Sequence, residues 1–227
     1  MQLSVIIPVY NEVNTITEII HRVVETKLAC EIIIVDDGST DGTRDVISSL
    51  QGNKTIHIIL LDRNYGKGHA ICKGLEVVQG DIVLIQDADL EYDPREYPNL
   101  LRPLEEDICD IVYGSRFLGG ARRPILFWNM VANKILTFTT NILYNNILSD
   151  METGYKVFRK NVLNGVQLKS KRFDIEPEFT AKMLKKGARI YEVPISFNPR
   201  DYSKGKKIKI TDAFKAMWTL IKYRFIN

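Results

Sequence analysis

Apolar runs alternate with segments of helical periodicity through the first half of the chain. The pattern predicts strands at residues 3–9, 32–35, 56–61, 82–85 and 111–112, with helices at 16–24, 41–50 and 68–78. Short apolar strands that alternate with amphipathic helices are typical of a mostly parallel sheet with helices on both faces. The predicted fold class is therefore α/β.

After Gly120 the pattern becomes helical over residues 125–148. Four asparagines spaced by four or eight residues form one polar stripe on such a helix, with apolar residues over most of the rest: Asn129, Asn133, Asn141 and Asn145. The polar side chains leave no apolar stretch of the ~18 residues that a spanning helix needs. The segment is expected either to pack in the core or to lie on a membrane surface.

Residues 210–225 predict a C-terminal amphipathic helix. Its expected apolar face consists of Ile210, Ala213, Phe214, Met217, Ile221 and Phe225. Lysine, arginine, Trp218 and Tyr223 lie beside this face, a composition that suits an anionic membrane surface. Docking of the helix on its own domain is the alternative.

Charge is distributed unevenly along the 227 residues, although the net charge is only +3. Residues 81–110 carry ten acids and two arginines, whereas residues 200–224 carry eight bases and two acids. A broad basic face for nucleic acid is not indicated. Three cysteines without a CxxC pair make a disulfide framework or a structural zinc site unexpected, and favour a reducing compartment.

Polar residues follow the first two predicted strands, where ligands bind in open parallel sheets. The first strand leads into Pro8-Val-Tyr-Asn-Glu12, and the second into Asp36-Asp37-Gly-Ser. Carboxylates at such a position can hold a base edge or ribose hydroxyls, so Asp37 is a candidate ligand, whereas Asp41 is expected to cap a helix. Neither GxGxxG nor a Walker loop is present. Lys67, between two glycines, is a candidate phosphate contact.

The fourth predicted strand leads into Asp87, Asp89 and Glu91 at alternate positions. In an extended strand these side chains would share one face, where a cation would relieve their repulsion. Oxygen ligands of this kind suit Mg²⁺ or Mn²⁺, which commonly also bind substrate phosphates. Asp93, directly before Pro94, is expected to belong to a turn.

The order of PVYNE, VDDGSTDGT, NYGKGHA, DADLEYDP and GSRF resembles the family 2 glycosyltransferases of the GT-A (Rossmann-like) fold. The sequence is most similar to the dolichol-phosphate mannose synthase-like, polyprenyl-phosphate glycosyltransferase group, from about Leu3 to Tyr202. The resemblance implies a GT-A domain over residues 1–200, with an amphipathic helical insertion at 122–148. A basic loop and the C-terminal amphipathic helix would follow at 201–227.

The resemblance also implies residue roles. Nucleotide-binding positions would be Pro8, Tyr10, Glu12, Val35 and Asp37. Asp87, Ala88, Asp89 and Glu91 would form the DxD-type sugar-diphosphate and metal site, although many relatives have Gln in place of Glu91. Asp150 resembles the acceptor-side aspartate, and the segment with Arg200 and Lys206 resembles a basic loop that closes on the diphosphate. Arg116, with Arg122 or Arg123, would position an acceptor phosphate.

These expectations favour metal-dependent, inverting transfer of a sugar from a nucleoside diphosphate sugar to a polyprenyl or dolichyl phosphate. A UDP-sugar is the favoured donor, and the expected place is the cytoplasmic face of a membrane, bound peripherally. A phosphate acceptor is largely dianionic at neutral pH and needs no strong base. Two alternatives remain open: a soluble glycosyltransferase with a hydroxyl acceptor, for which Asp150 would be the base, and an inactive nucleotide-sugar binding module.

Overall fold

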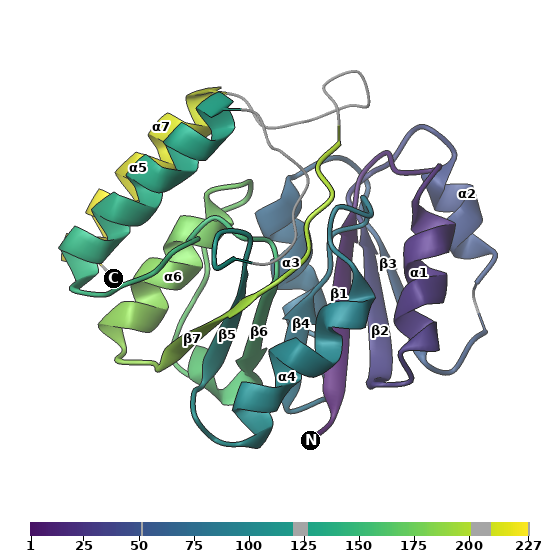
Figure 1. The fold of residues 1–227 in the computed structure, drawn as a ribbon. Helices are drawn as coiled ribbons and strands as arrows, with labels where there is room; N and C mark the ends of the chain where they lie inside the picture. Colours follow the sequence, from purple (N-terminus) through teal and green to yellow (C-terminus); the bar gives the residue numbers. More distant parts are fainter. Residues whose placement is uncertain (51, 120–126, 201–209, 227) are drawn as a thin grey trace.

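A seven-stranded sheet in the order β3-β2-β1-β4-β6-β5-β7 forms the centre of the protein (Figure 1). The structure is a computed structural model that describes residues 1–50, 52–119, 127–200 and 210–226. The strands are β1 Leu3–Val9, β2 Ala29–Asp36, β3 Ile56–Leu60, β4 Ile82–Ile85, β5 Ile111–Ser115, β6 Lys156–Arg159 and β7 Ile190–Pro194. The α-helices are α1 Ile16–Glu25, α2 Thr43–Ser48, α3 Lys67–Leu75, α4 Tyr97–Glu105, α5 Phe127–Tyr144, α6 Ile175–Lys185 and α7 Ile210–Phe225. The described residues also form two 3-10 helices, η1 Pro94–Glu96 and η2 Lys160–Leu163.

The sheet is mostly parallel, as predicted. β1 pairs in parallel with β2 and β4, β2 with β3, and β5 with β7. β6 lies between β4 and β5 and runs antiparallel to both. The other six strands therefore end at one edge of the sheet, which we call the carboxyl edge, and the segments that follow β1, β2, β4 and β5 meet there.

Helices cover both faces of the sheet, which explains why the strands are almost continuously apolar. One core layer contains Ile19 of α1, Ile47 of α2 and Leu100 of α4. The opposite layer contains residues of α3, α5, α6 and α7, among them Phe179 and Leu220. The α/β fold with two covered faces, predicted from the hydrophobic pattern, is confirmed.

Most predicted boundaries agree with the structure, and the differences have local causes. β1, β4 and α7 have the predicted limits. The second helix is shorter than expected because Gly42, at φ 97°, occupies its N-cap position. The carboxylate of Asp41 accepts the N–H of Thr43 at 3.0 Å, so Asp41 still closes this end of the helix. The expected helix at 125–148 ends at Tyr144, and Asn145 follows in a left-handed conformation at φ 49°.

Three of the four stripe asparagines, Asn129, Asn133 and Asn141, lie on the side of α5 that faces the protein, whereas Asn145 follows the helix and is exposed. Asn133 is buried, and Asn141 exchanges two hydrogen bonds with the backbone of Leu148. Five large apolar side chains of α5 are exposed instead, at positions 127, 128, 135, 138 and 142, whereas Leu136 is buried.

In α7, Ala216, Thr219, Leu220 and Tyr223 are buried. Several residues of its predicted apolar face are exposed. Helical periodicity identified two faces on each helix but did not indicate which face packs on the protein.

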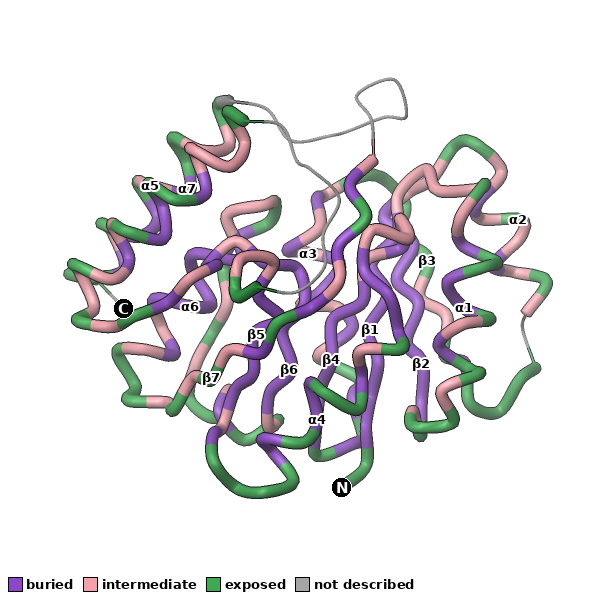
Figure 2. Tube along the Cα trace, viewed as in Figure 1, coloured by how far each residue is buried: buried purple, intermediate pink, exposed green. Residues whose placement is uncertain are grey.

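α5 and α7 lie side by side, and the Tyr144 hydroxyl donates to the Leu220 carbonyl at 2.7 Å (Figures 1 and 2). Among their described side chains, nine large apolar ones are exposed, and we call them the outer apolar set: Phe127, Trp128, Ile135, Phe138, Ile142, Phe214, Trp218, Ile221 and Phe225. In the described part of the chain, no helix combines the length and hydropathy needed to cross a membrane.

Candidate functional site

Three residues far apart in the sequence meet at the carboxyl edge. The guanidinium of Arg200, which follows β7, donates to both carboxylate oxygens of Glu12 at 2.9 and 3.0 Å. The same guanidinium lies 3.1 Å from the carboxylate of Asp89. Arg200 is thus held between an acid that follows β1 and an acid that follows β4, which places its charge where an anionic ligand would meet the edge.

A second group of charged side chains begins at the same edge, at Asp87, and continues to side chains of α3, α6 and β6. The ammonium of Lys67 is 2.7 Å from the carboxylate of Asp87 and 3.3 Å from that of Glu176. Glu176 also pairs with the buried Lys156 at 2.6 Å. Burial alone would lower the pKa of Lys67, but these two carboxylates raise it, so the lysine stays charged. Sequence reasoning missed Glu176, because an acid in the first turn of a helix is an ordinary feature.

The three acids after β4 do not share one strand face, which corrects the expectation from their alternate spacing. The strand ends at Ile85, and the chain turns through Leu90 at φ 63°. Asp87 faces Lys67 and Asp89 faces Arg200, while Glu91 accepts the backbone N–H of Arg200 at 2.8 Å. No group of three His, Cys, Asp or Glu side chains in the described residues is arranged to hold a metal.

Asp87 and Asp89 nevertheless have the chemistry of a divalent-cation site. Both are carboxylates at the carboxyl edge, and each already neutralises a positive charge. Two hard oxygen donors fit Mg²⁺ or Mn²⁺ when substrate phosphates and water supply the remaining ligands. Asp93, by contrast, has the structural role expected of it: it caps η1 and accepts the N–H of Arg95 at 3.0 Å.

Asp37 anchors the loop that begins α3. Its two carboxylate oxygens accept the N–H groups of Tyr65 and Gly66 at 2.8 and 2.7 Å. Burial raises the pKa of Asp37, and the two N–H donors oppose this. The preceding Asp36 is buried against Arg44 and serves the fold. Contact of Asp37 with a nucleotide stays a prediction, and the structure adds its role in fixing the loop before Lys67.

The other predicted nucleotide-binding positions differ in accessibility. Pro8 lies opposite Val35 in the β1–β2 ladder, and Val35 is completely buried, so direct contact of its side chain with a ligand has no support here. Ala88 is buried, and Tyr10 is partly exposed beyond the end of β1. The remaining predicted residues, Arg122, Arg123 and Lys206, lie outside the described part of the chain.

Arg116 and Asp150 form a two-pronged ion pair beyond the end of β5. The Nε and Nη2 atoms of Arg116 donate to the two carboxylate oxygens at 2.7 and 2.8 Å, and its backbone N–H donates at 3.0 Å. Asn133 of α5 donates to the same carboxylate at 2.8 Å. Burial would raise the pKa of Asp150, but Arg116 and these donors hold it below its usual range. Asp150 is therefore a poor proton acceptor in this arrangement.

Glu152 lies near this pair in a less favourable environment. Its Oε1 atom is buried and has no hydrogen-bond partner among the described residues. Burial raises the pKa of Glu152 from 4.5 to about 7, and the nearby charge of Lys156 offsets this only in part.

The raised pKa predicts that the free energy of unfolding falls as the pH rises from about 4.5 to 7. Over this range Glu152 is ionised in the unfolded chain but still largely protonated in the folded chain. Glu152→Gln should remove this effect and raise the free energy of unfolding by about 3 kcal/mol at pH 8, with little change at pH 4. Urea unfolding at both pH values measures it. The exposed Glu105→Gln is the control, and a gain that is equal at both pH values would contradict the assignment.

Comparisons with known proteins place this site in a family. A sequence profile described as Glycosyl transferase family 2 matches residues 4–166. The chain is 30% identical over 230 residues to a dolichol-phosphate mannosyltransferase of Pyrococcus furiosus. The alignment covers 98% of this chain and 64% of that protein. It is 26% identical over 235 residues to a dodecaprenyl-phosphate galacturonate synthase of Rhizobium johnstonii, covering 99% of this chain and 67% of that protein. The chain thus spans about two thirds of the length of these relatives.

Solved structures agree on the fold. Glucosyl-3-phosphoglycerate synthase from Mycobacterium tuberculosis, in complex with phosphoglyceric acid, superposes with a TM-score of 0.77 at 18% identity. The superposition covers 100% of this chain and 81% of that one. The GT-A fold implied by the motifs is therefore confirmed. Since the profile matches most of the sequence and the Pyrococcus relative matches nearly all of it, the chain belongs to glycosyl transferase family 2.

Proposed function

We propose that this chain transfers a sugar from a nucleoside diphosphate sugar, favoured as a UDP-sugar, to a polyprenyl phosphate. The observation that carries the choice of acceptor is that the Asp150 carboxylate is fully engaged by hydrogen-bond donors and has a lowered pKa. Its oxygens accept hydrogen bonds from Arg116 and Asn133. A hydroxyl acceptor needs a base, and Asp150 suits that role poorly, whereas a phosphate dianion needs none.

The names of two relatives support this acceptor class, since one is a dolichol-phosphate and the other a dodecaprenyl-phosphate enzyme. The donor class has weaker support. The similar M. tuberculosis synthase was crystallised with Mn²⁺ and UDP-glucose and with Mg²⁺ and UDP. Mg²⁺ or Mn²⁺, held by Asp87 and Asp89, would neutralise charge on the diphosphate when bound.

In the proposed reaction an acceptor phosphate oxygen forms a bond to the anomeric carbon of the sugar while the bond to the nucleoside diphosphate breaks. Direct displacement inverts the anomeric centre. Arg200 would meet the diphosphate once the ligand competes with Glu12 and Asp89 for its guanidinium. Arg116, oriented by Asp150, would contribute to the acceptor side.

A donor panel tests the proposal. UDP-glucose, GDP-mannose and a UDP-N-acetylhexosamine would each be incubated with a short polyprenyl phosphate, and the extracted lipid analysed by mass. We expect a monoglycosylated polyprenyl phosphate with at least one donor. Sugar transfer only to a hydroxyl acceptor such as phosphoglycerate would replace this proposal with the soluble-acceptor alternative.

Gly154 supplies a test of the position of Asp87. A Cβ atom at Gly154 would overlap Oδ2 of Asp87, so Gly154→Ala must shift this carboxylate, which pairs with Lys67 through its Oδ1 atom. We expect the transfer rate to fall by at least about tenfold, since small displacements of reacting groups are costly. Gly80→Ala is the control for crowding alone: its Cβ would lie 2.5 Å from Ser4 Oγ and 2.6 Å from the Gln2 carbonyl oxygen, but it lies before β4, at the opposite end of the strand. An unchanged rate in Gly154→Ala would show that Asp87 tolerates displacement.

The proposed acceptor is a lipid, and we place the chain at the cytoplasmic face of a membrane, bound through the outer apolar set. Nine exposed apolar side chains on two adjacent helices are typical of an interaction surface. The exposed cations Lys134, Lys215 and Arg224 on the same helices suit anionic lipids.

Binding to anionic vesicles is therefore expected, and it should weaken as salt screens the surface charges. Phe138→Ser should weaken it at least about tenfold, because burying a phenylalanine contributes ~1.5–3 kcal/mol. Co-sedimentation measures the binding. Val77→Ser, at an exposed residue beyond the end of α3, is the control. Equal binding of the wild type and Phe138→Ser would remove α5 from the docking surface.

A further inference from the structure

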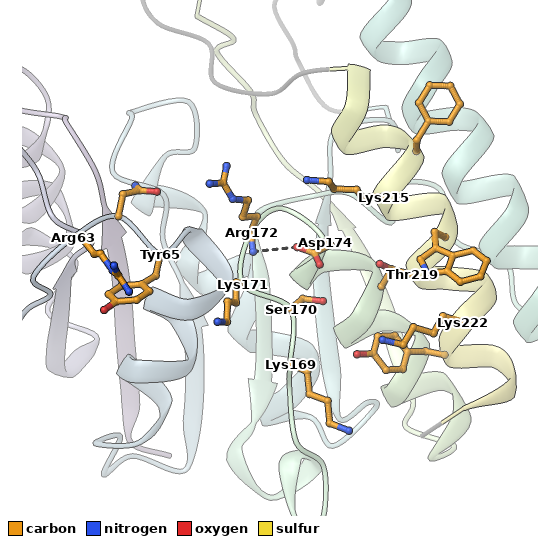
Figure 3. Close-up of a pocket in the computed structure, with 14 residues that line it drawn as sticks. Arg63, Tyr65, Lys169, Ser170, Lys171, Arg172, Asp174, Lys215, Thr219 and Lys222 are labelled. Carbon is orange, nitrogen blue, oxygen red and sulfur yellow. Dashed lines mark hydrogen bonds between the residues drawn. The ribbon is translucent and has the colours of Figure 1, made fainter.

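A cavity of about 980 Å³ lies beside α7, separate from the residues that face one another at the carboxyl edge. Three segments form its walls: residues 63–65 after β3, residues 169–174 before α6, and one side of α7 (Figure 3). Six of its lining side chains are cationic and one is acidic. The cations are Arg63, Lys169, Lys171, Arg172, Lys215 and Lys222, and the acid is Asp174. We call this the basic cavity.

The cations of the basic cavity have little internal neutralisation. None of the ion pairs among the described residues involves a cation of this cavity. Asp174 accepts the backbone N–H of Arg172 at 3.0 Å, and the Arg63 guanidinium lies over the ring of Tyr65 at 4.9 Å. Lysines on a convex surface are ordinarily just solvated. Here they line one hollow from three segments of the chain, so a bound anion would meet positive charge from more than one wall.

The α7 wall adds apolar surface to this charge. Phe214 and Trp218 line the cavity and also belong to the outer apolar set, with 74% and 66% of their surface exposed. Lys215 and Lys222 lie on the same helix, and in Figure 3 Lys215 extends from α7 toward the side of Arg172. Cations next to exposed aromatic rings match a ligand with an anionic head and an apolar tail.

The basic cavity adjoins the carboxyl edge without sharing its charged residues. Asp87, Asp89 and Arg200 do not line it. Tyr65 connects the two regions, since its backbone N–H binds Asp37 while its side chain lines the cavity. The Lys171 carbonyl accepts the N–H of His69, which connects the wall formed by residues 169–174 to α3.

From these observations the geometry points to a lipid site: the basic cavity binds the phosphate head group of an anionic membrane phospholipid. The lipid chains would extend over Phe214 and Trp218, along the surface by which α7 is proposed to dock. This site rests on the proposed membrane docking but not on sugar transfer. One lipid bound per chain would orient the chain on the bilayer, in addition to the non-specific attraction between basic side chains and anionic lipids.

The test uses a phospholipid too short to form bilayers, so that vesicle binding is not required. The chain has two tryptophans, and Trp128→Phe leaves Trp218, in the wall of the cavity, as the reporter. Dihexanoyl phosphatidylglycerol, titrated below its micelle concentration, should change Trp218 emission in a saturable way. Lys171→Glu with Lys215→Glu, in the same background, should weaken this binding at least tenfold. Lys54→Glu, an exposed lysine outside the cavity, should leave it unchanged.

Three further ligands distinguish the sources of a signal. Dihexanoyl phosphatidylcholine should bind much more weakly, and equal binding would overturn the anionic head-group assignment. Saturation by inorganic phosphate at the same concentrations would instead identify a free-phosphate site. Complete competition by UDP-glucose with Mg²⁺ would make the cavity part of the donor site. Failure of short-chain lipid to bind, with vesicle binding intact, overturns the cavity site and leaves the docking surface and the transferase proposal standing.

Discussion

Removal of divalent metal is expected to abolish sugar transfer, and Asp89→Ala should reduce the rate about a thousandfold. Electrostatic stabilisation of a departing diphosphate is among the largest contributions to such a reaction, and losing one preorganised group commonly costs about 10²–10³ in rate. Asp89 lies within 3.1 Å of Arg200 at the carboxyl edge, so its loss also releases the guanidinium from one of its two acidic partners.

The measurement is the transfer rate in excess EDTA, followed by restoration with Mg²⁺ or Mn²⁺. Asp93→Ala is the matched control, because Asp93 belongs to the same acidic stretch but caps η1. It should lower stability and leave turnover nearly intact. UDP binding, measured by calorimetry with and without metal, separates loss of the cation site from loss of the fold. Full activity in EDTA, or a rate in Asp89→Ala equal to that of Asp93→Ala, would refute the metal assignment.

The sequence predicted the first five strands because each is a short apolar run that can be recognised without knowledge of its neighbours. β1 and β4 have the predicted limits, and the polar residues that follow them do meet at the carboxyl edge. β6 and β7 were not predicted. Four residues with a basic side chain at each end, as in β6, carry almost no periodic signal. The antiparallel insertion of β6 depends on contacts with β4 and β5 that are remote in sequence.

The candidate site was likewise predicted only in part: the sequence identified most of its residues but not how they pair. Residue types identified the acids and cations, but their pairing depends on how the chain turns after β4, with Leu90 in a left-handed conformation between Asp89 and Glu91. The pairing of Glu176 with both Lys67 and Lys156 joins three elements and left no local pattern. The inverted amphipathicity of α5 was hidden for a different reason: hydrophobic periodicity alone does not indicate which face of a helix packs on the core.

The pair Arg116–Asp150 offers the sharpest distinction between acceptor classes. If the acceptor is a phosphate, Arg116 stabilises a dianion, and Arg116→Ala should lower the acceptor-dependent rate about ten- to a hundredfold, since one charge-assisted hydrogen bond contributes ~1.5–3 kcal/mol. Arg116→Lys should be intermediate, because lysine keeps the charge and loses the two-pronged geometry. Asp150→Asn should retain measurable transfer.

Folding must be checked in each variant, because removing one partner of a buried ion pair can cost about 3–5 kcal/mol of stability. The rates are measured at saturating donor, with donor hydrolysis subtracted. With a phosphate acceptor the rate should rise through the second ionisation of the phosphate, near pH 6, and then stay level. Asp150 should add no ionisation near neutral pH, because Arg116 and Asn133 lower its pKa. A hydroxyl acceptor reverses the ranking, since Asp150 would then take the proton. A more severe loss in Asp150→Asn than in Arg116→Ala, with folding and donor affinity unchanged, would replace the phosphate-acceptor mechanism with that one.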